Sequence, residues 1–330
     1  AEPLFMARRK CPNLQIFKGD YKLYSKMSNQ LYNYFCQFTP NVERFSVDEC
    51  FLDMTGTELI YGDPVKLAYR MKNEIYKNFG YTVNVGVANN KLCAKMASDF
   101  EKPNKVHTLF MNEIPTKMWP LPVSDLFMVG KASSKVLLDM GVHTIGDLAK
   151  IDLSILKRHF KSQGEMMHNY ANGIDYSPVG ENKTKNKSIS VTETLEHDIE
   201  KTTEFKKILL RQADRVGKQA RKANVYATTI ALIFKTSDFV SYTHQAKLIN
   251  PTNVTEEIYK VCVGLLDKGW RGEPIRLVGI RLADFTNNNT KQMSIFDQEK
   301  DLHTDKIQSI LDDITDKFGD GIIMPASLKE

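Results

Sequence analysis

The segment Phe45-Ser-Val-Asp-Glu-Cys-Phe-Leu-Asp-Met-Thr55 places two adjacent carboxylates, Asp48 and Glu49, inside an apolar run. The run, which includes Val42 and Val47, otherwise has the pattern of a buried β-hairpin. Burial of an ionised carboxylate is costly without a neutralising cation, and neighbouring strand residues point to opposite faces. We therefore expect a sharp turn that brings both side chains to the rim of a site. Two hard oxygen ligands there would suit Mg²⁺; a solvated hairpin tip is the plain alternative.

Regular patterns extend outward from this hairpin. Apolar residues at helical spacing predict helices over residues 20–38 and 64–79. Residues 81–88 have the pattern of a buried strand, and 90–99 that of a helix. This order predicts an α+β region over residues 18–117.

Two motifs resemble those of the Y-family translesion DNA polymerases, the DinB/UmuC superfamily of bacterial UV-damage repair. Ser46-Val-Asp-Glu-Cys-Phe-Leu-Asp53 is similar to the Ser-x-Asp-Glu motif of that family. Asn84-Val-Gly-Val-Ala-Asn-Asn-Lys-Leu-Cys-Ala-Lys-Met-Ala-Ser-Asp99 looks like its palm strand and helix, and Lys102-Pro-Asn104 like the turn that follows. Pro3-Leu-Phe-Met-Ala-Arg-Arg-Lys-Cys-Pro-Asn-Leu14 is similar to the segment just before the palm.

The resemblance implies template-directed nucleotidyl transfer with two Mg²⁺ ions, DNA and a dNTP as substrates, and a place in DNA repair and the SOS response. By that resemblance Asp48 bridges the metals, and Glu49 binds the metal that activates the primer hydroxyl. Lys102 matches a lysine that contacts the incoming triphosphate, and Lys95 is a second basic contact. Asp53 takes a structural role at the strand end.

One departure concerns the beginning of the sequence, which opens at Ala1. The family's first palm strand, with another metal-binding Asp and an aromatic steric gate, has no counterpart here, nor has most of its fingers region. We therefore expect residues 1–17 to be the end of the fingers, and this form of the enzyme to hold part of the metal site and to be inactive alone. Two rival functions are a non-catalytic, clamp-tethered DNA-binding protein and a nucleotide cyclase-like palm.

Residues 118–180 have the pattern of a helical module. Within them, Pro122 to Lys131 and Leu137 to Leu148 resemble a helix-hairpin-helix, whose turn binds a DNA phosphate through backbone N–H groups. Gly130 is expected to permit the tight turn, and Lys131 adds a positive charge. By the resemblance this module is a thumb; an ordinary helical hairpin is the alternative.

The next segment, residues 181–188, is polar and basic and predicts a flexible linker that adds salt-sensitive DNA affinity through Lys183, Lys185 and Lys187. A βαββαβ pattern follows over residues 189–290 and matches the family's little finger. Its strands place Lys235 and Lys247, with Thr228 and Thr243, among the exposed candidates for DNA contact. A generic ferredoxin-like fold would give the same pattern.

The last 40 residues predict a partner and a helix. Gln292, Met293, Ser294, Ile295 and Phe296 resemble the bacterial sliding-clamp-binding motif, a short peptide with apolar anchors; packing onto the little finger is the alternative. Residues 302–318 have helical periodicity. The sign of the net charge differs between these two parts of the chain. Residues 182–290 carry 18 Lys and Arg against 12 Asp and Glu, while residues 291–330 carry 5 Lys and Arg against 9 Asp and Glu.

Length and composition indicate the class of protein and the kinds of site that are not expected. At 330 residues, 42% apolar and 26% charged, the sequence predicts a globular protein of several domains. The resemblance implies that these form an α+β multidomain fold: a ferredoxin-like palm, a helical thumb with a helix-hairpin-helix, and a βαββαβ little finger. No apolar stretch approaches the ~20 residues of a membrane span. The five scattered cysteines and seven histidines lack the spacing of zinc sites or disulfides. We expect a cytoplasmic, nucleoid-associated monomer.

Overall fold

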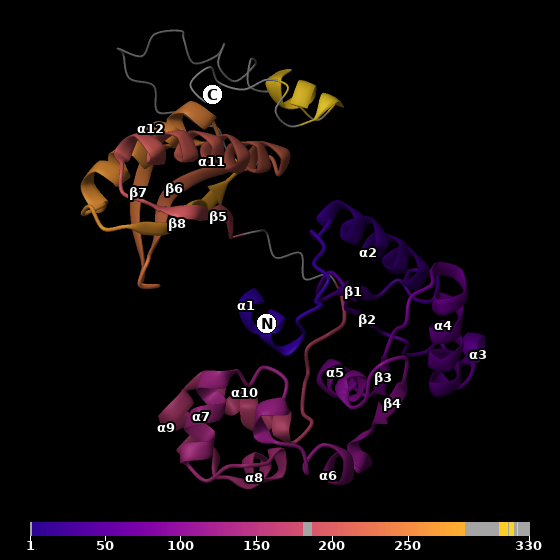
Figure 1. Ribbon diagram of the computed structural model, residues 1–330. Helices are drawn as coiled ribbons and strands as arrows, with labels where there is room; N and C mark the ends of the chain where they lie inside the picture. Colours follow the sequence, from indigo (N-terminus) through magenta and orange to yellow (C-terminus); the bar gives the residue numbers. More distant parts are fainter. Residues whose placement is uncertain (1, 181–186, 288–309, 316, 320–321, 323–330) are drawn as a thin grey trace. The chain divides into compact units, whose positions relative to one another are not determined.

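The computed structural model describes residues 2–180, 187–287, 310–315, 317–319 and 322. The chain forms two compact units, residues 1–182 and 183–330 (Figure 1). The boundary falls in the segment that the sequence marks as a basic linker. Each unit has hydrophobic clusters of its own.

Helix α4 (Pro64–Phe79) shows how the sequence sets element ends in the first unit. The Asp63 carboxylate accepts a hydrogen bond from the Lys66 backbone N–H, and Pro64 fills the first helical position, where no N–H is needed. Gly80 ends the helix with φ 75°. Together with α2 (Tyr21–Phe35), α4 encloses a small core rich in aromatic residues.

The carboxylate-bearing segment is a hairpin of β1 (Val42–Arg44) and β2 (Cys50–Leu52). Val42 is buried, but Phe45 and Val47 are 45% and 58% exposed. The prediction of a buried hairpin was therefore wrong for the apolar residues next to the carboxylates. The strands end before Phe45, so these side chains lie on the turn.

A parallel β–α–β unit follows α4, and its first strand and its helix are the ones that the sequence pattern predicted. Strand β3 (Val85–Ala88) pairs with β4 (Val106–Leu109), and α5 (Lys91–Asp99) connects them. The helix approaches β3 so closely that a Cβ on Gly86 would lie 1.9 Å from the Ala94 carbonyl oxygen. Glycine is required here by the contact between strand and helix.

The described strands of the first unit form two separate two-stranded sheets, β1–β2 and β3–β4. Strand β3 is shorter than the one expected over residues 81–88, and the sequence did not indicate β4. Helices α4 and α5 both contact β3. The α+β class is confirmed, and the described strands of this region form two small sheets instead of one.

The rest of the first unit is helical, as expected for residues 118–180. The remaining elements are α1 (Leu4–Lys10), α3 (Glu58–Tyr61), η1 (Met111–Glu113), α6 (Ile114–Lys117), η2 (Val123–Asp125), α7 (Lys131–Asp139), α8 (Ile145–Lys150), α9 (Leu153–Phe160) and α10 (Ser162–Ala171). One core cluster joins α5 and β4 to α7, α8, α9 and α10. The helical region therefore packs directly on the helix that follows β3.

The second unit is a four-stranded antiparallel sheet with two helices, the predicted βαββαβ order. Its elements are β5 (Ser188–Ile199), α11 (Thr202–Lys222), β6 (Tyr226–Thr236), β7 (Ser241–Thr252), α12 (Thr255–Gly269) and β8 (Ile275–Thr286). The strand order is β5-β8-β6-β7. Both helices cover the same face of the sheet (Figure 1), and a buried cluster lies between the two layers. Among the described elements of this unit, none of the helices covers the other face.

The predicted C-terminal helix is confirmed where the structure describes it, over residues 310–315 and 317–318. Asp312 on this helix forms an ion pair of 2.6 Å with Arg221 of α11, and the two side chains are 19% and 14% exposed. Arg221 also donates to the Asn253 carbonyl oxygen at 2.6 Å. Within the described ranges, no helix has the length and apolar composition needed to cross a membrane.

Candidate active site and nucleic-acid interface

Asp48 and Glu49 lie on a tight turn at the tip of the β1–β2 hairpin. The backbone N–H groups of Phe45 and Ser46 both donate to the Glu49 carbonyl oxygen, at 2.9 and 3.2 Å. The Ser46 hydroxyl oxygen lies 2.7 Å from Asp48 Oδ1 and 3.3 Å from Glu49 Oε2. Both carboxylates are thus within reach of one hydroxyl group, on the side where the turn meets solvent, as the sequence suggested.

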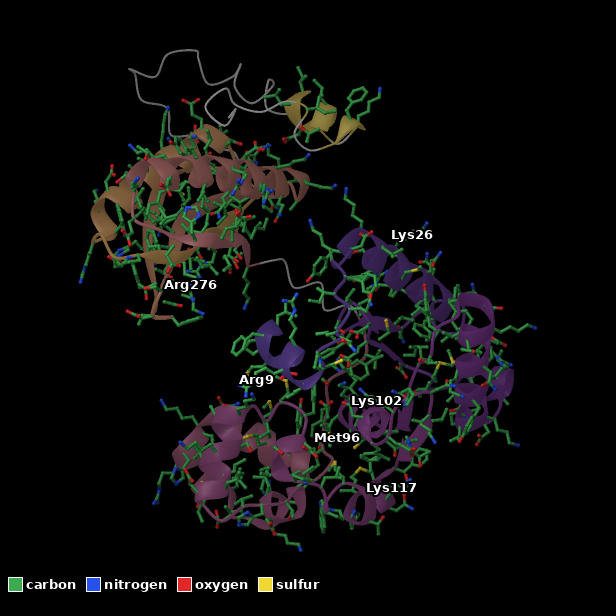
Figure 2. The ribbon with its side chains drawn as sticks, viewed as in Figure 1. Arg9, Lys26, Met96, Lys102, Lys117 and Arg276 are labelled. Carbon is green, nitrogen blue, oxygen red and sulfur yellow. The ribbon has the colours of Figure 1, made fainter. Side chains whose placement is uncertain are left out.

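Lys95 of α5 contacts the Glu49 carboxylate, and Asp99 links Lys95 to Lys102 in the turn that follows α5. Lys95 Nζ is 2.5 Å from Glu49 Oε1 and 2.9 Å from Asp99 Oδ2. Asp99 also pairs with Lys102, labelled in Figure 2, at 2.7 Å. The result is a row of alternating charges, Glu49, Lys95, Asp99 and Lys102. The structure therefore brings together four site residues, of which the sequence indicated all but Asp99.

The contacts within this row shift the pKa values of Lys95 and Asp99. Burial opposes the charge on Lys95, but hydrogen bonds to Glu49 and Asp99 outweigh that effect and raise the pKa of Lys95. Burial likewise opposes the charge on Asp99, yet hydrogen bonds from Lys102 and Lys95 lower its pKa. Both shifts favour the charged forms at neutral pH.

A second lysine pair, which the sequence did not reveal, fixes α5 against the hairpin. Lys91 Nζ lies 2.7 Å from both carboxylate oxygens of Glu43, and the two side chains are only 14% and 16% exposed. Glu43 also accepts a hydrogen bond from the Gly180 backbone N–H at 3.2 Å. Lys91 and Lys95, one helical turn apart, thus bind the base and the tip of the same hairpin.

The start of α5 is held by its cap. The Asn90 side-chain oxygen accepts from the Cys93 N–H at 2.8 Å, and its amide donates to the Gly173 carbonyl oxygen at 2.8 Å. Asp53, at the far end of the hairpin, accepts from the Thr55 N–H. This hydrogen bond is a local contact within the turn after β2.

In the predicted helix-hairpin-helix, the turn before α7 does not have the left-handed residue that the sequence indicated. Gly130 precedes α7 with φ −82°, a conformation that any residue adopts, and the left-handed residue in the turn is Met128, with φ 69°. The expectation that Gly130 permits the turn by its backbone freedom was therefore wrong. Gly130, Lys131 and Lys135 instead line a hollow of about 440 Å³ at the start of α7.

In the second unit, we call the sheet face that α11 and α12 leave uncovered the open face. Four rows of cross-strand neighbours define it. The rows are Ser188, Ala283, Thr229 and Lys247; Ser190, Arg281, Ala231 and Gln245; Thr192, Gly279, Ile233 and Thr243; and Thr194, Leu277, Lys235 and Ser241. These positions carry three cations and no carboxylate. The open face therefore combines small, mostly polar side chains with positive charge.

Arg281, in the middle of the open face, was missed by the sequence reasoning. Its buried Nε has no hydrogen-bond partner among the described residues. Strand register, with β6 and β8 paired, is the information that would have found it. Thr228, in contrast, donates to the Asp284 carbonyl oxygen and is not part of the rows. Lys235, Lys247 and Thr243 lie on the open face as expected.

Some predicted sites lie outside the described residues. They are Lys183 and Lys185 in the linker and the clamp motif from Gln292 to Phe296. Lys187 is described and exposed.

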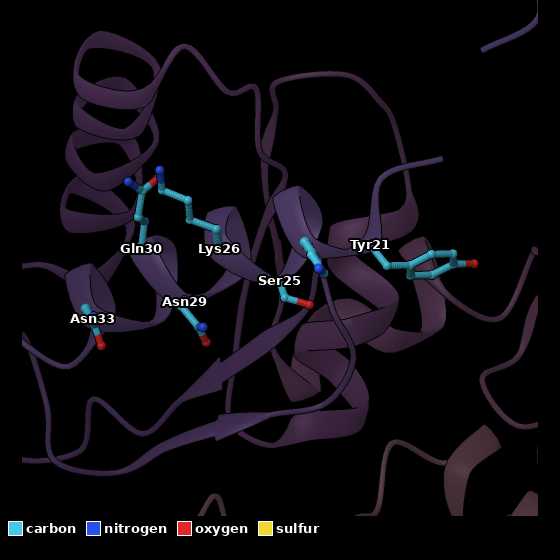
Figure 3. A pocket seen from close by; sticks show the side chains of 7 residues that line it. Tyr21, Ser25, Lys26, Asn29, Gln30 and Asn33 are labelled. Atoms are coloured by element: carbon cyan, nitrogen blue, oxygen red, sulfur yellow. The ribbon is translucent and has the colours of Figure 1, made fainter. Parts of the chain in front are cut away.

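A larger hollow of about 690 Å³ is lined by residues of a single helix, α2 (Figure 3). Tyr21, Lys22, Lys26 and Gln30 are among its lining residues. It includes none of the carboxylates or lysines of the site. An open helix surface of this kind does not enclose a substrate.

Comparison with known families covers both units. Residues 1–99 match the impB/mucB/samB family, and residues 186–295 match the C-terminal domain of that family. Residues 124–175 match the thumb domain of DNA polymerase-iota.

Curated relatives are similar along nearly the whole chain. The DNA polymerase IV of Clostridium acetobutylicum is 42% identical over 329 residues, which are 100% of this chain and 83% of the relative. The DNA polymerase IV 2 of Bacillus subtilis is 34% identical, over 99% of this chain and 81% of the relative.

A solved Y-family DNA polymerase chimera of Dbh and Dpo4 has the same fold, with a TM-score of 0.74 at 24% identity, covering 87% of this chain and 83% of that one. A ternary complex of Dbh DNA polymerase gives a TM-score of 0.56 at 23% identity, with the same coverage. Motifs, fold and full-length relatives agree, and the chain belongs to the Y family of DNA polymerases.

Proposed function

We propose that the hairpin tip with Asp48 and Glu49 is the place where the polymerase that contains this sequence adds nucleotides to a DNA primer. Family membership supplies the reaction class, a DNA-directed DNA polymerase of the translesion type. The observation that supports the site is the meeting of the hairpin carboxylates with Lys95 of α5, which lies 46 residues away from Glu49 in the sequence.

The donor set at the tip fits Mg²⁺. Asp48 and Glu49 offer only hard oxygen atoms, and their partial exposure leaves room for the water and phosphate oxygens that this ion retains. Among the described residues no group of three or more His, Cys, Asp and Glu side chains is placed to hold a metal ion. When bound, two such ions stabilise the attacking 3′-oxygen and the leaving pyrophosphate.

Lys95 and Lys102 are suited to bind the triphosphate of a dNTP. Both ammonium groups are held by Asp99, which fixes their positions before substrate arrives. Phosphate oxygens can replace a carboxylate as the acceptor, because charge-assisted hydrogen bonds to either group are similar in kind. Asp99 then acts as a positioning residue for two substrate-binding lysines.

Two surfaces are suited to bind the DNA backbone without reading its sequence. The hollow at the start of α7 offers backbone N–H groups, Lys131 and Lys135. The open face offers Lys235, Lys247 and Arg281, and the unpartnered Nε of Arg281 fits a missing phosphate acceptor. We accordingly assign residues 18–117 to the palm, 118–180 to the thumb and 189–290 to the little finger.

Residues 1–17 are assigned to the fingers region and 181–188 to a linker. Within residues 291–330, the segment from Gln292 to Phe296 is proposed to bind a bacterial sliding clamp, on the strength of its sequence alone. We expect the polymerase to act as a monomer in the cytoplasm, at the nucleoid, because DNA is there.

The competing function is a DNA-binding protein of the same architecture without turnover. Asp48→Asn and Glu49→Gln in the protein that carries this sequence test it by single-nucleotide extension on a primed template. Each should lower the extension rate by about a thousandfold or more, because transition-state charge loses its stabilisation. Primer–template affinity should stay near that of the parent protein.

Glu101→Gln is the matched control, since Glu101 pairs with Lys105 on the exposed side of the same region. It should leave extension unchanged. Parent-like extension by the Asp48 and Glu49 variants would remove both residues from the mechanism.

A further inference from the structure

The turn between β6 and β7 presents an aromatic ring to solvent on a fixed backbone. Phe239 is 63% exposed and has φ 65°, the left-handed region that bulky residues rarely adopt. Its N–H donates to the Thr236 carbonyl oxygen at 3.0 Å, and the Thr236 N–H donates to the Val240 carbonyl oxygen at 2.9 Å. Strain of this kind persists where the surroundings enforce it, and it is enriched at binding sites.

Two cations flank the ring. Lys235 Nζ lies 4.9 Å from the Phe239 ring centroid, and Arg276 Cζ lies 5.0 Å from it. Arg276 is labelled in Figure 2. It is held by Asp198, with Nε 3.2 Å from Oδ1. The carboxylate of Asp198 therefore orients the guanidinium and offsets part of its charge.

Strand register explains why Arg276 reaches the ring. In the pairing of β8 with β6, Ile275 faces Thr236 and Leu277 faces Lys235, so Arg276 between them has no partner. In the pairing of β8 with β5, Arg276 also has no partner. An extra residue of this kind is a β-bulge, and bulges redirect a side chain next to functional sites. The Ser237 N–H donates to the Pro274 carbonyl oxygen at 3.1 Å, which ties the turn to the start of β8.

The site continues the open face. Lys235 belongs to its last row, and the turn that bears Phe239 begins directly after that row. A nucleic-acid strand lying along the open face would reach the ring at this end of the sheet. An exposed ring beside cations is the arrangement that binds single-stranded nucleic acid, where a base stacks on the ring and the cations contact its phosphates.

We propose that Phe239, Lys235 and Arg276 form a binding site for an unpaired nucleotide of the DNA strand that lies on the open face. This inference rests on the proposed DNA binding of that face and adds a preference for single-stranded overhangs next to a duplex. The ring stacks on the base, and every base has a face suited to it, so the site does not select sequence.

Fluorescence anisotropy on the whole chain tests the site with three probes of equal duplex length: a blunt duplex, a duplex with a short unpaired template overhang, and the same overhang without bases. Phe239→Ala should weaken binding of the normal overhang about tenfold, the scale of one base–aromatic stack. Affinity for the blunt and base-free probes should not change. Phe239→Trp should restore overhang binding, with fluorescence quenched by the base.

Val240→Ala is the matched control, because Val240 lies on the same turn and is 60% exposed. It should not change the affinity for any probe. Equal losses on all three probes, an unaltered overhang affinity in Phe239→Ala, or the same loss in Val240→Ala would each overturn the proposed site. Absence of duplex binding by the parent chain would instead contradict the DNA-binding function of the open face.

Discussion

Glu43 forms an ion pair with Lys91 that no sequence motif indicates. Its carboxylate neutralises Lys91, which comes 48 residues later in the chain, and both groups are largely removed from solvent. A buried pair contributes little net stability when it forms, because desolvation offsets the attraction. Loss of one partner is different, since the remaining charge stays buried without compensation.

Glu43→Gln should therefore lower the free energy of unfolding of the first unit by about 3 kcal/mol. The Lys91 side chain is 14% exposed, and the amide of Gln replaces only part of its interaction with the carboxylate. Chemical denaturation, followed by a probe in the first unit, measures the change.

The matched control is Glu101→Gln. Its partner is Lys105, and those side chains are 59% and 47% exposed, so the change should stay within about 1 kcal/mol. Similar losses for the two variants would show that the Glu43 pair is no more important than a surface pair.

Among the elements, α5 is the one that positions the site. Its buried residues pack into the core that also holds the helices after η2, and its polar side carries Lys91 and Lys95. The distance between α5 and β3 is set by Gly86, where a Cβ would collide with backbone. Small changes at that contact must move the lysines relative to the hairpin.

Gly86→Ala should destabilise the first unit by about 2 kcal/mol or more, because overpacking against backbone cannot be relieved by a rotamer change. Gly130→Ala is the comparison: a Cβ there meets nothing within 4 Å, and its φ is −82°. It should leave stability nearly unchanged. Thermal unfolding of both variants distinguishes a strict need for glycine from a tolerated one, and a harmless Gly86→Ala would contradict the packing.

Periodicity predicted the longer helices and the strands of the second unit, because each of these buries one face and its apolar residues recur at the matching spacing, whereas the short strand β4 was missed. The second unit follows its predicted order from β5 to β8. The site was predicted only in part. Asp48, Glu49, Lys95 and Lys102 stand in recognisable motifs, but the Glu43 pair, the place of Arg281 and the left-handed Met128 depend on tertiary packing or register. Val47 is exposed because β1 ends at Arg44, so that the turn already includes Phe45, Ser46 and Val47.

On the scale of the whole molecule, the two units have separate cores, and each core contains one buried cysteine. Cys93 lies in the core of the first unit and Cys262 in that of the second. Burial raises the pKa of the Cys93 thiol to about 11 and that of Cys262 to about 12. Both react slowly while folded, because the thiolate is the reactive form.

Thiol labelling over a denaturant series should therefore give a separate transition for each unit. Cys11, Cys36 and Cys50 are replaced by Ser, so that labelling at Cys93 and Cys262, read by peptide mass, reports the two cores. Adding Glu43→Gln should shift the Cys93 transition to lower denaturant and leave that of Cys262 in place. Coincident transitions that shift together would show one cooperative unit.

The contact between Lys95 and Glu49 bears on whether the fold of this region depends on a metal ion. A zinc-dependent domain unfolds when a chelator removes its ion, since ligand binding and folding are one event. In this chain an ammonium group already balances the carboxylate of Glu49. The fold around Glu49 therefore does not depend on a bound ion to offset the charge of this carboxylate.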